Sequence, residues 1–119
     1  MSTLRRLYEV LDGPHAERSL EMLAPGLRFS ILFSLGPDGA QDFAGGRAEF
    51  DGYMAQRGAP SWTHHVLYES SDGRVELAIG ETRQDGAPVA TFVAAVRLDE
   101  AGLIDRYIVG RSPAVLFEL

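Results

Sequence analysis

The chain contains no cysteine and no lysine. Without cysteine there can be no disulfide bond, thiol nucleophile or thiolate metal site, and without lysine there can be no Schiff-base catalysis by a side chain. No apolar run approaches the roughly 18 residues of a membrane span, and the first twelve residues lack the pattern of a secretion signal. The lack of a membrane span and of a secretion signal favours a cytoplasmic protein with no membrane partner.

Positive charge is also scarce. Eleven arginines stand against seventeen acidic residues, which gives a formal net charge of −6. A chain this acidic is poorly suited to bind the phosphates of nucleic acids or the headgroups of anionic lipids. What is present is the composition of a globular protein, with 45% hydrophobic and 24% charged residues. At 119 residues we expect one domain that spans residues 1–119.

Hydrophobic spacing predicts three helices and five strands. Leu4, Leu7, Tyr8 and Leu11 form a helical stripe within Thr3–Asp12, with Ser2 or Thr3 as the N-cap. The other predicted helices are His15–Leu23 and Arg47–Gln56. Period-two alternation and turn residues predict strands at Leu27–Leu35, Trp62–Glu69, Val75–Arg83, Val89–Leu98 and Leu103–Arg111. The Gly- and Asp-rich stretch Gly36–Gly46 is expected to be an exposed loop.

This order of elements indicates an α+β fold. Most of the strands follow the helices and are joined by short Asp-Gly turns, which is typical of antiparallel hairpins. We therefore expect a bent antiparallel sheet that wraps as a cone around three N-terminal helices. A ligand pocket would open at the mouth of the cone.

Several segments, taken in order, resemble the nuclear transport factor 2-like superfamily, in its SnoaL-like and ketosteroid-isomerase-like branch. They are Leu4–Asp12, Leu20–Phe29, Phe43–Ala48, Trp62–Val66 and Arg97–Ile104. Arg97–Ile104 matches a recurrent strand-turn-strand pattern of that superfamily. The resemblance implies a cystatin-like α+β barrel. The superfamily includes isomerases, dehydratases, cyclases, hydrolases and non-enzymatic binding domains, so the fold alone does not select a function.

The catalytic pattern of the steroid isomerases does not carry over to this sequence. Where that pattern has a carboxylate base the chain has Ser30-Ile31, and where it has a protonated acid the chain has Ala94. Only its helix tyrosine has a near-counterpart, in Tyr8. A proton shuttle cannot work without its base, which argues against ketosteroid isomerase activity.

Strand alternation and the resemblance together predict which side chains line the pocket. The predicted lining is Phe29, Ile31, Tyr53, Met54, Glu76, Phe92, Ala94, Tyr107 and Arg111. The small residues Ala78, Gly80 and Ala94 are expected to leave volume for a ligand. Arg111 could bind a ligand carboxylate together with Glu76 or Asp105, or these side chains could simply pair with one another.

The candidate catalytic residues are His64 and Tyr8. SnoaL-like relatives often carry a pocket histidine at the position of His64, and a neutral imidazole can move a proton near pH 7. Tyr8 could donate its phenolic hydrogen to a ligand carbonyl. The competing interpretations are that His64 or His65 caps its strand, and that Tyr8 only packs in the core. Adjacent histidines on a strand point to opposite faces, so we expect no metal site. The resemblance to cofactor-free enzymes also leads us to expect no cofactor.

Two functions remain open. One is a cofactor-free lyase, isomerase or cyclase that acts by acid–base chemistry on a small, largely apolar or aromatic carbonyl compound. The other is a ligand-binding or assembly module without catalysis. In either case a homodimer is expected, because alternation leaves two apolar rows on the convex face of the sheet. These rows are Val75, Leu77 and Ile79 on one strand and Val89, Thr91, Val93 and Ala95 on its neighbour.

Overall fold

The first helix, α1 (Thr3–Leu11), begins where the sequence predicts. The Ser2 side chain caps it by accepting a hydrogen bond from the Arg5 amide at 3.2 Å. Its apolar stripe faces the core, and the four stripe residues are all at most 4% exposed. In the computed structural model, which describes residues 2–36, 39–57 and 62–117, α1 is followed by the 3₁₀ helix η1 (Ala16–Met22) and later by α2 (Arg47–Arg57).

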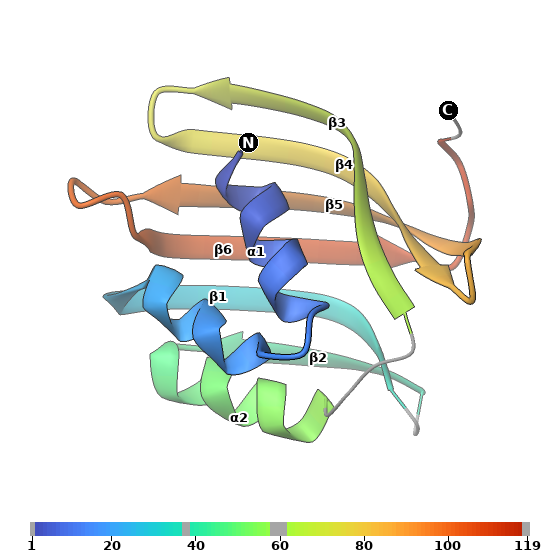
Figure 1. Cartoon of the computed structure of the whole chain (residues 1–119), viewed down its shortest axis with the longest axis horizontal. Helices are drawn as coiled ribbons and strands as arrows, with labels where there is room; N and C mark the ends of the chain where they lie inside the picture. Colours follow the sequence, from blue (N-terminus) through green and yellow to red (C-terminus); the bar gives the residue numbers. More distant parts are fainter. Residues whose placement is uncertain (1, 37–38, 58–61, 118–119) are drawn as a thin grey trace.

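Six strands form one sheet in the order β2-β1-β6-β5-β4-β3. Their bounds are β1 (Leu23–Gly36), β2 (Gly39–Gly45), β3 (Trp62–Asp72), β4 (Val75–Gln84), β5 (Ala87–Leu98) and β6 (Ile104–Ser112). The three helices lie against one face of this sheet (Figure 1). The α+β class and the N-terminal helices are thus confirmed. None of the described helices is long and apolar enough to cross a bilayer.

The sheet is mixed rather than wholly antiparallel. β1 and β6 pair in parallel, while the other neighbouring pairs are antiparallel. The parallel pair arises because β1 lies early in the chain and β6 is the last strand, so no hairpin joins them. β1 also starts at Leu23, four residues before the predicted Leu27.

The prediction of a loop over Gly36–Gly46 is wrong for most of its length. Gly39–Gly45 forms the edge strand β2, paired with β1 from Phe29↔Gly45 to Gly36↔Gly39. The side chains of this segment have weak intrinsic strand propensity, so the strand is stabilised mainly by its backbone hydrogen bonds with β1. Phe43 anchors it, with its ring 4.9 Å from that of Tyr53 on α2.

The helix-facing side of the sheet and the helices enclose the core. Its largest fully buried side chains include Phe50 of α2 and Phe92 of β5. Glu76 lies at the edge of this core, where its carboxylate accepts hydrogen bonds from the amides of Thr3 and Leu4 at 3.2 and 3.1 Å. A carboxylate is favoured there because the first amides of a helix lack partners within the helix. Glu76 therefore holds α1 on the sheet.

Candidate active site

His64, at the start of β3, points to the helix side of the sheet, and its side chain is 5% exposed. Asp12, the C-cap residue of α1, contacts both the backbone amide and the imidazole of His64. Its carboxylate accepts a hydrogen bond from the His64 amide at 2.6 Å and lies 3.0 Å from the imidazole Nδ1. The Asp12 side chain is itself only 9% exposed. The two residues form a buried Asp–His pair that ties the end of α1 to β3.

The other imidazole nitrogen of His64 lies 3.0 Å from Nη2 of Arg111 on β6. A guanidinium has no acceptor atom, so the imidazole Nε2 must be the acceptor in this contact. The Nδ1 then carries the hydrogen and donates it to Asp12. The geometry therefore specifies a neutral imidazole in its Nδ1–H tautomer, oriented by a carboxylate.

Tyr8 lies flat against this imidazole. The two rings are stacked with centroids 4.4 Å apart and an interplanar angle of 13°. The Tyr8 hydroxyl is 2.9 Å from the hydroxyl of Tyr107, and both residues are at most 5% exposed. Whichever phenol donates in this contact, the other keeps its own proton for a further acceptor. Tyr8 is therefore both a core residue and a possible donor to a ligand.

Burial raises the pKa of Tyr8 above its ordinary value, although the hydrogen bond with Tyr107 and the charge of Arg111 partly offset the shift. Burial raises the pKa of Tyr107 as well. Both phenols are consequently protonated at neutral pH, the form in which a phenol donates a hydrogen bond.

These polar groups converge on one internal cavity. It is lined by Tyr8, Leu11, Ile31, Phe50, Tyr53, His64, Tyr107, Val109 and Arg111. Its volume is only about 10 Å³, which is room for roughly one water molecule. A larger ligand would require at least one lining side chain to move.

The cavity brings together part of the predicted lining. Ile31, Tyr53, Tyr107 and Arg111 are there, with His64 and Tyr8. Phe29 is absent and packs edge-on against Phe50, with centroids 5.1 Å apart. Four other predicted lining residues do not reach the cavity. Glu76 caps α1 instead. Met54, Phe92 and Ala94 are buried in the core.

The volume expected above the small residues is not there. At Gly80, a Cβ atom would stand close to the Phe92 ring and to the His65 carbonyl oxygen, so the Phe92 side chain already fills that space. Ala78 and Ala94 are 3% and 1% exposed and form part of the same packed core. Gly80 therefore makes room for an aromatic ring of the protein itself.

Asp105 is also not where alternation placed it. The pairing of β5 with β6 shifts between Arg97 and Leu98, which turns the Asp105 side chain away from the cavity. There it forms two 2.9 Å hydrogen bonds with Arg97. Arg111 consequently meets neither Asp105 nor Glu76 and instead contacts His64.

His65 lies on the opposite face from His64, as alternation predicts, because it pairs with Glu81 while His64 pairs with the inward-facing Thr82. The hydroxyl of Thr63 is 2.7 Å from the His65 Nε2. Partial burial, followed by the nearby charge of Arg83, lowers the pKa of His65.

Asp12 is a site residue that was not predicted from the sequence. The position of Asp12 was nevertheless an indication. A carboxylate at the C-terminal end of a helix interacts unfavourably with the helix dipole, so it requires a stabilising partner elsewhere in the fold. His64, 52 residues later, is that partner. The contact between Arg111 and His64 left no comparable signal, because no spacing rule connects the first residues of β3 with the end of β6.

No protein-family model matches this sequence, and no curated protein matches it. Among solved structures, the chain has the fold of SnoaL-like and nuclear transport factor 2-like proteins, matched over nearly its whole length.

Three solved structures illustrate this likeness. A proposed isomerase of the SnoaL-like family from Agrobacterium tumefaciens superposes with a TM-score of 0.70 at 17% identity, covering 92% of this chain and 95% of that one. A proposed polyketide cyclase from Streptomyces antibioticus gives 0.70 at 18% identity, with coverages of 92% and 89%. A nuclear transport factor 2-like protein of unknown function from Cytophaga hutchinsonii gives 0.63 at 15% identity, with coverages of 92% and 87%.

Proposed function

We propose that the protein is a cofactor-free acid–base enzyme that acts on a small, largely apolar carbonyl compound, with His64 and Tyr8 as catalytic residues. One observation carries this proposal: His64, which Asp12 orients, and the Tyr8–Tyr107 phenol pair line the same cavity. Enolisation of a carbonyl compound requires a base and a hydrogen-bond donor that face the same small cavity. The fold is shared with proteins described as proposed isomerases and polyketide cyclases, which is consistent with such chemistry.

In this proposal His64 is the base. A C–H bond beside the carbonyl breaks, its proton goes to the imidazole Nε2, and its electron pair moves toward the carbonyl oxygen. The Asp12 carboxylate stabilises the imidazolium that forms, because it already accepts the Nδ1 hydrogen. Arg111 must leave Nε2 for this transfer, and its guanidinium then becomes available to a negatively charged ligand oxygen.

The Tyr8–Tyr107 pair is the donor. The phenolic proton not used between the two hydroxyls is donated to the carbonyl oxygen and stabilises the enolate. Return of the proton to another carbon gives an isomerisation, loss of a β-substituent gives a lyase reaction, and attack of the enolate on a second carbonyl gives ring closure. The apolar remainder of the lining, including Leu11, Ile31 and Val109, favours a substrate with little other polarity.

A thermal-shift screen against small aromatic and terpenoid carbonyl compounds tests whether the cavity binds such ligands. A ligand at a hundredfold excess over its Kd stabilises the folded state by roughly 2.7 kcal/mol. The shift should be reduced in Tyr107→Phe, which removes one phenol of the pair, and kept in His65→Gln, which changes the opposite face. If no carbonyl compound stabilises the wild type, or if Tyr107→Phe responds like the wild type, the proposal fails.

The cavity volume of about 10 Å³ favours a second candidate, a ligand-binding or assembly module without catalysis. In that case Asp12, His64 and Arg111 would be a buried polar network that holds α1, β3 and β6 together. The two candidates differ in one observable: a module binds carbonyl ligands without exchanging their α-hydrogens with solvent, whereas the enzyme exchanges them.

We also propose that the chain forms a homodimer through the outer face of the sheet. On β4 and β5 this face exposes aliphatic side chains, with Leu77 52% and Val93 57% exposed. Thr91 is an exception to the predicted apolar row, because its hydroxyl donates to the Ala114 carbonyl and accepts from the Leu116 amide, and it is 6% exposed. The residues after β6 thus cover one end of the face. A second copy would cover the exposed aliphatic part.

A further inference from the structure

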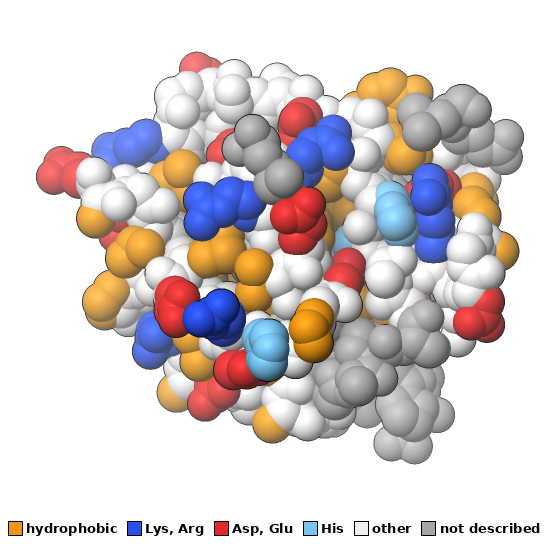
Figure 2. Space-filling model, viewed as in Figure 1, with side chains coloured by type: hydrophobic (Ala, Val, Ile, Leu, Met, Phe, Trp, Pro, Cys, Tyr) orange, Lys and Arg blue, Asp and Glu red, His pale blue; other side chains and the backbone are white. Residues whose placement is uncertain are grey.

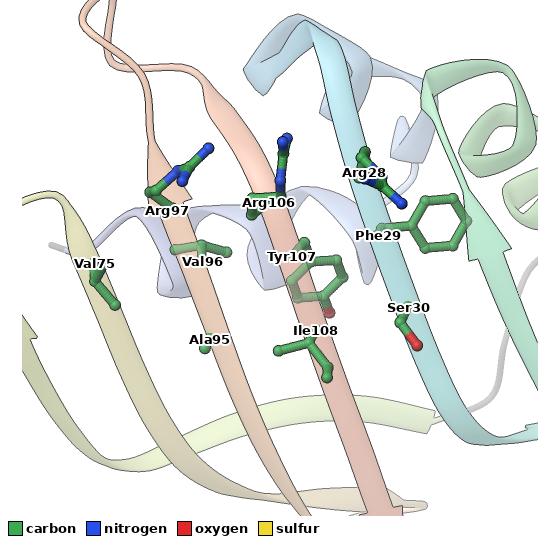
Figure 3. Close-up of a pocket in the computed structure, with 10 residues that line it drawn as sticks. All are labelled: Arg28, Phe29, Ser30, Val75, Ala95, Val96, Arg97, Arg106, Tyr107 and Ile108. Carbon is green, nitrogen blue, oxygen red and sulfur yellow. The ribbon is translucent and has the colours of Figure 1, made fainter.

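The outer face of the sheet also carries a row of arginines. The strand register sets Arg28 of β1 opposite Arg106 of β6, and Arg106 opposite Arg97 of β5. The three side chains stand next to one another on three adjacent strands (Figure 3). Like charges directly across a strand pair are destabilising, so such a row requires compensation. On the helix-covered face, in contrast, acidic and basic side chains are interspersed (Figure 2).

Compensation within the described residues is incomplete. Asp105 forms its two hydrogen bonds with Arg97 alone. The hydrogen bond from Arg97, together with the charges of Arg97, Arg106 and Arg74, lowers the pKa of the Asp105 carboxyl. The Asp105 carboxylate is therefore hydrogen-bonded to Arg97 and only lies in the field of the other guanidinium groups. Arg106 otherwise donates only to the carbonyls of Gly26 and Asp105, and both Arg28 and Arg106 are without a carboxylate partner in the described part of the chain.

Beside the arginine row the face is hollowed. The next outward-facing cross-strand row holds Ser30, Ile108 and Ala95, and the row beyond it holds Leu32, Gly110 and Val93. Ser30 and Ala95 are small, whereas Leu32 and Val93 stand exposed at the far side. The result is a groove of about 350 Å³ whose lining includes all three arginines. The groove is shallow and largely open to solvent, so a ligand would lie along it rather than be enclosed.

From this arrangement we infer that the groove binds a small amphipathic anion, with its acid group at Arg28 and Arg106 and its apolar body over Ser30, Ala95 and Ile108. Guanidinium groups suit carboxylates because they donate two parallel hydrogen bonds. The lining ends at the Ser30–Ile108–Ala95 row, two residues or about 7 Å along the strands from the Arg28 row. This limited length fits a short aliphatic or aromatic acid better than an extended protein segment. The site is separate from the internal cavity and does not depend on the proposed reaction.

The groove is lined by β1, β6 and β5 alike, and by Val75 of β4. The proposed dimer contact is centred on Leu77 of β4 and Val93 of β5, but Val75 and Ala95 of its predicted rows line the groove, so a dimer that buried those two residues would compete with the ligand. A fully buried arginine row between two copies would instead leave guanidinium groups without partners in the interface, which is costly.

Titration of the isotope-labelled protein with decanoate, followed by ¹H–¹⁵N correlation spectra, tests the inference. We expect the largest shift changes at the amides of Ser30, Ala95 and Ile108. Affinity should fall at least tenfold in Arg28→Gln/Arg106→Gln, should fall with added salt, and should be far lower for the neutral analogue decan-1-ol. The matched control is Arg6→Gln/Arg18→Gln, which removes two exposed arginines elsewhere and should retain wild-type affinity.

Four results would overturn the inference. Decanoate could fail to bind at millimolar concentration, or it could instead shift the amides around His64 and Tyr53, which line the internal cavity and not the groove. The two double variants could lose affinity equally. Finally, Arg28→Gln/Arg106→Gln could change the monomer–dimer equilibrium and leave decanoate binding intact, which would assign the row to an interface between copies.

Discussion

The guanidinium of Arg111 donates to the Nε2 of His64 across 3.0 Å, and this contact specifies the chemical state of the imidazole. Since arginine offers no acceptor, His64 is neutral and carries its hydrogen on Nδ1, facing Asp12. The contact also explains the small size of the cavity, because the Arg111 side chain occupies the space in front of the proposed base.

The tautomer can be measured directly. At neutral pH, the ¹⁵N shifts of His64 should show a protonated Nδ1 and an unprotonated Nε2 that accepts a hydrogen bond. His64→Gln serves to assign the signals, and His65 provides a second imidazole outside the cavity for comparison. Protonation on Nε2 alone would contradict the proposed hydrogen bond from Arg111.

The buried phenols predict a loss of stability in alkali. In the unfolded chain a tyrosine ionises near pH 10, whereas burial raises the pKa values of Tyr8 and Tyr107 in the folded state. The folded state therefore holds protons that the unfolded state releases. The contribution of these groups to the free energy of unfolding is complete below about pH 10 and decreases as the pH rises toward the folded-state pKa values.

Each such tyrosine can reduce the free energy of unfolding by up to about 1.4 kcal/mol per pH unit in this range. Denaturant titrations between pH 9 and 11.5 should show a shallower decrease for Tyr107→Phe than for wild type. The near-ultraviolet absorbance of phenolate from these two tyrosines should appear only on unfolding. An equal slope in the variant would show that Tyr107 ionises normally in the folded state.

A substitution at Gly80 tests whether the Phe92 ring fills the space that the sequence had predicted for a ligand. A methyl group at this position would overlap the Phe92 ring and the His65 carbonyl, so Gly80→Ala should lower the free energy of unfolding by about 1–3 kcal/mol. Gly52 of α2 is the matched control, because nothing lies within 4 Å of its added Cβ. Gly52→Ala should stabilise the protein by about 0.5–1 kcal/mol. A neutral Gly80→Ala would mean that open space exists beside Phe92.

The proposed dimer predicts a mass of about twice the 13.0 kDa of the chain in light scattering at micromolar concentration. Val93→Arg should convert it to a monomer, because the substitution places a charge in the middle of the exposed apolar rows. Glu9→Arg, a change on an exposed helix position, should remain dimeric. A wild-type mass near 13.0 kDa would reject the dimer, and a dimeric Val93→Arg would place the contact on another surface.

Much of the fold follows from local patterns in the sequence. The apolar stripe of α1 and the alternation over Phe92–Val96 specify which residues are buried, since both periods are set by backbone geometry. β2 was not predictable in this way because its stability comes from pairing with β1 rather than from its own side chains. Similarly, the irregular register beside Leu98 displaced Asp105, and no residue pattern announces such a shift.

The candidate site was predictable only in part. Alternation placed Tyr107 and Arg111 inward, and both line the cavity with His64. The partners of these groups depend on how distant elements approach one another, as with Asp12 and His64 or Tyr8 and Tyr107. The sequence also could not predict what fills the space above Gly80. The Phe92 ring of the neighbouring strand fills it, and its orientation depends on the packing of the whole core.

Solvent hydrogen exchange tests the proposed catalysis most directly. Carbonyl compounds that stabilise the protein are incubated with it in D₂O, and loss of their α-hydrogen signals is followed by ¹H NMR. Because a positioned general base contributes about 10²–10⁴-fold, His64→Gln should reduce the exchange rate by at least a hundredfold, while His65→Gln should retain it. Binding without protein-dependent exchange, or equal exchange by wild type and His64→Gln, would contradict the assignment of His64 as the base.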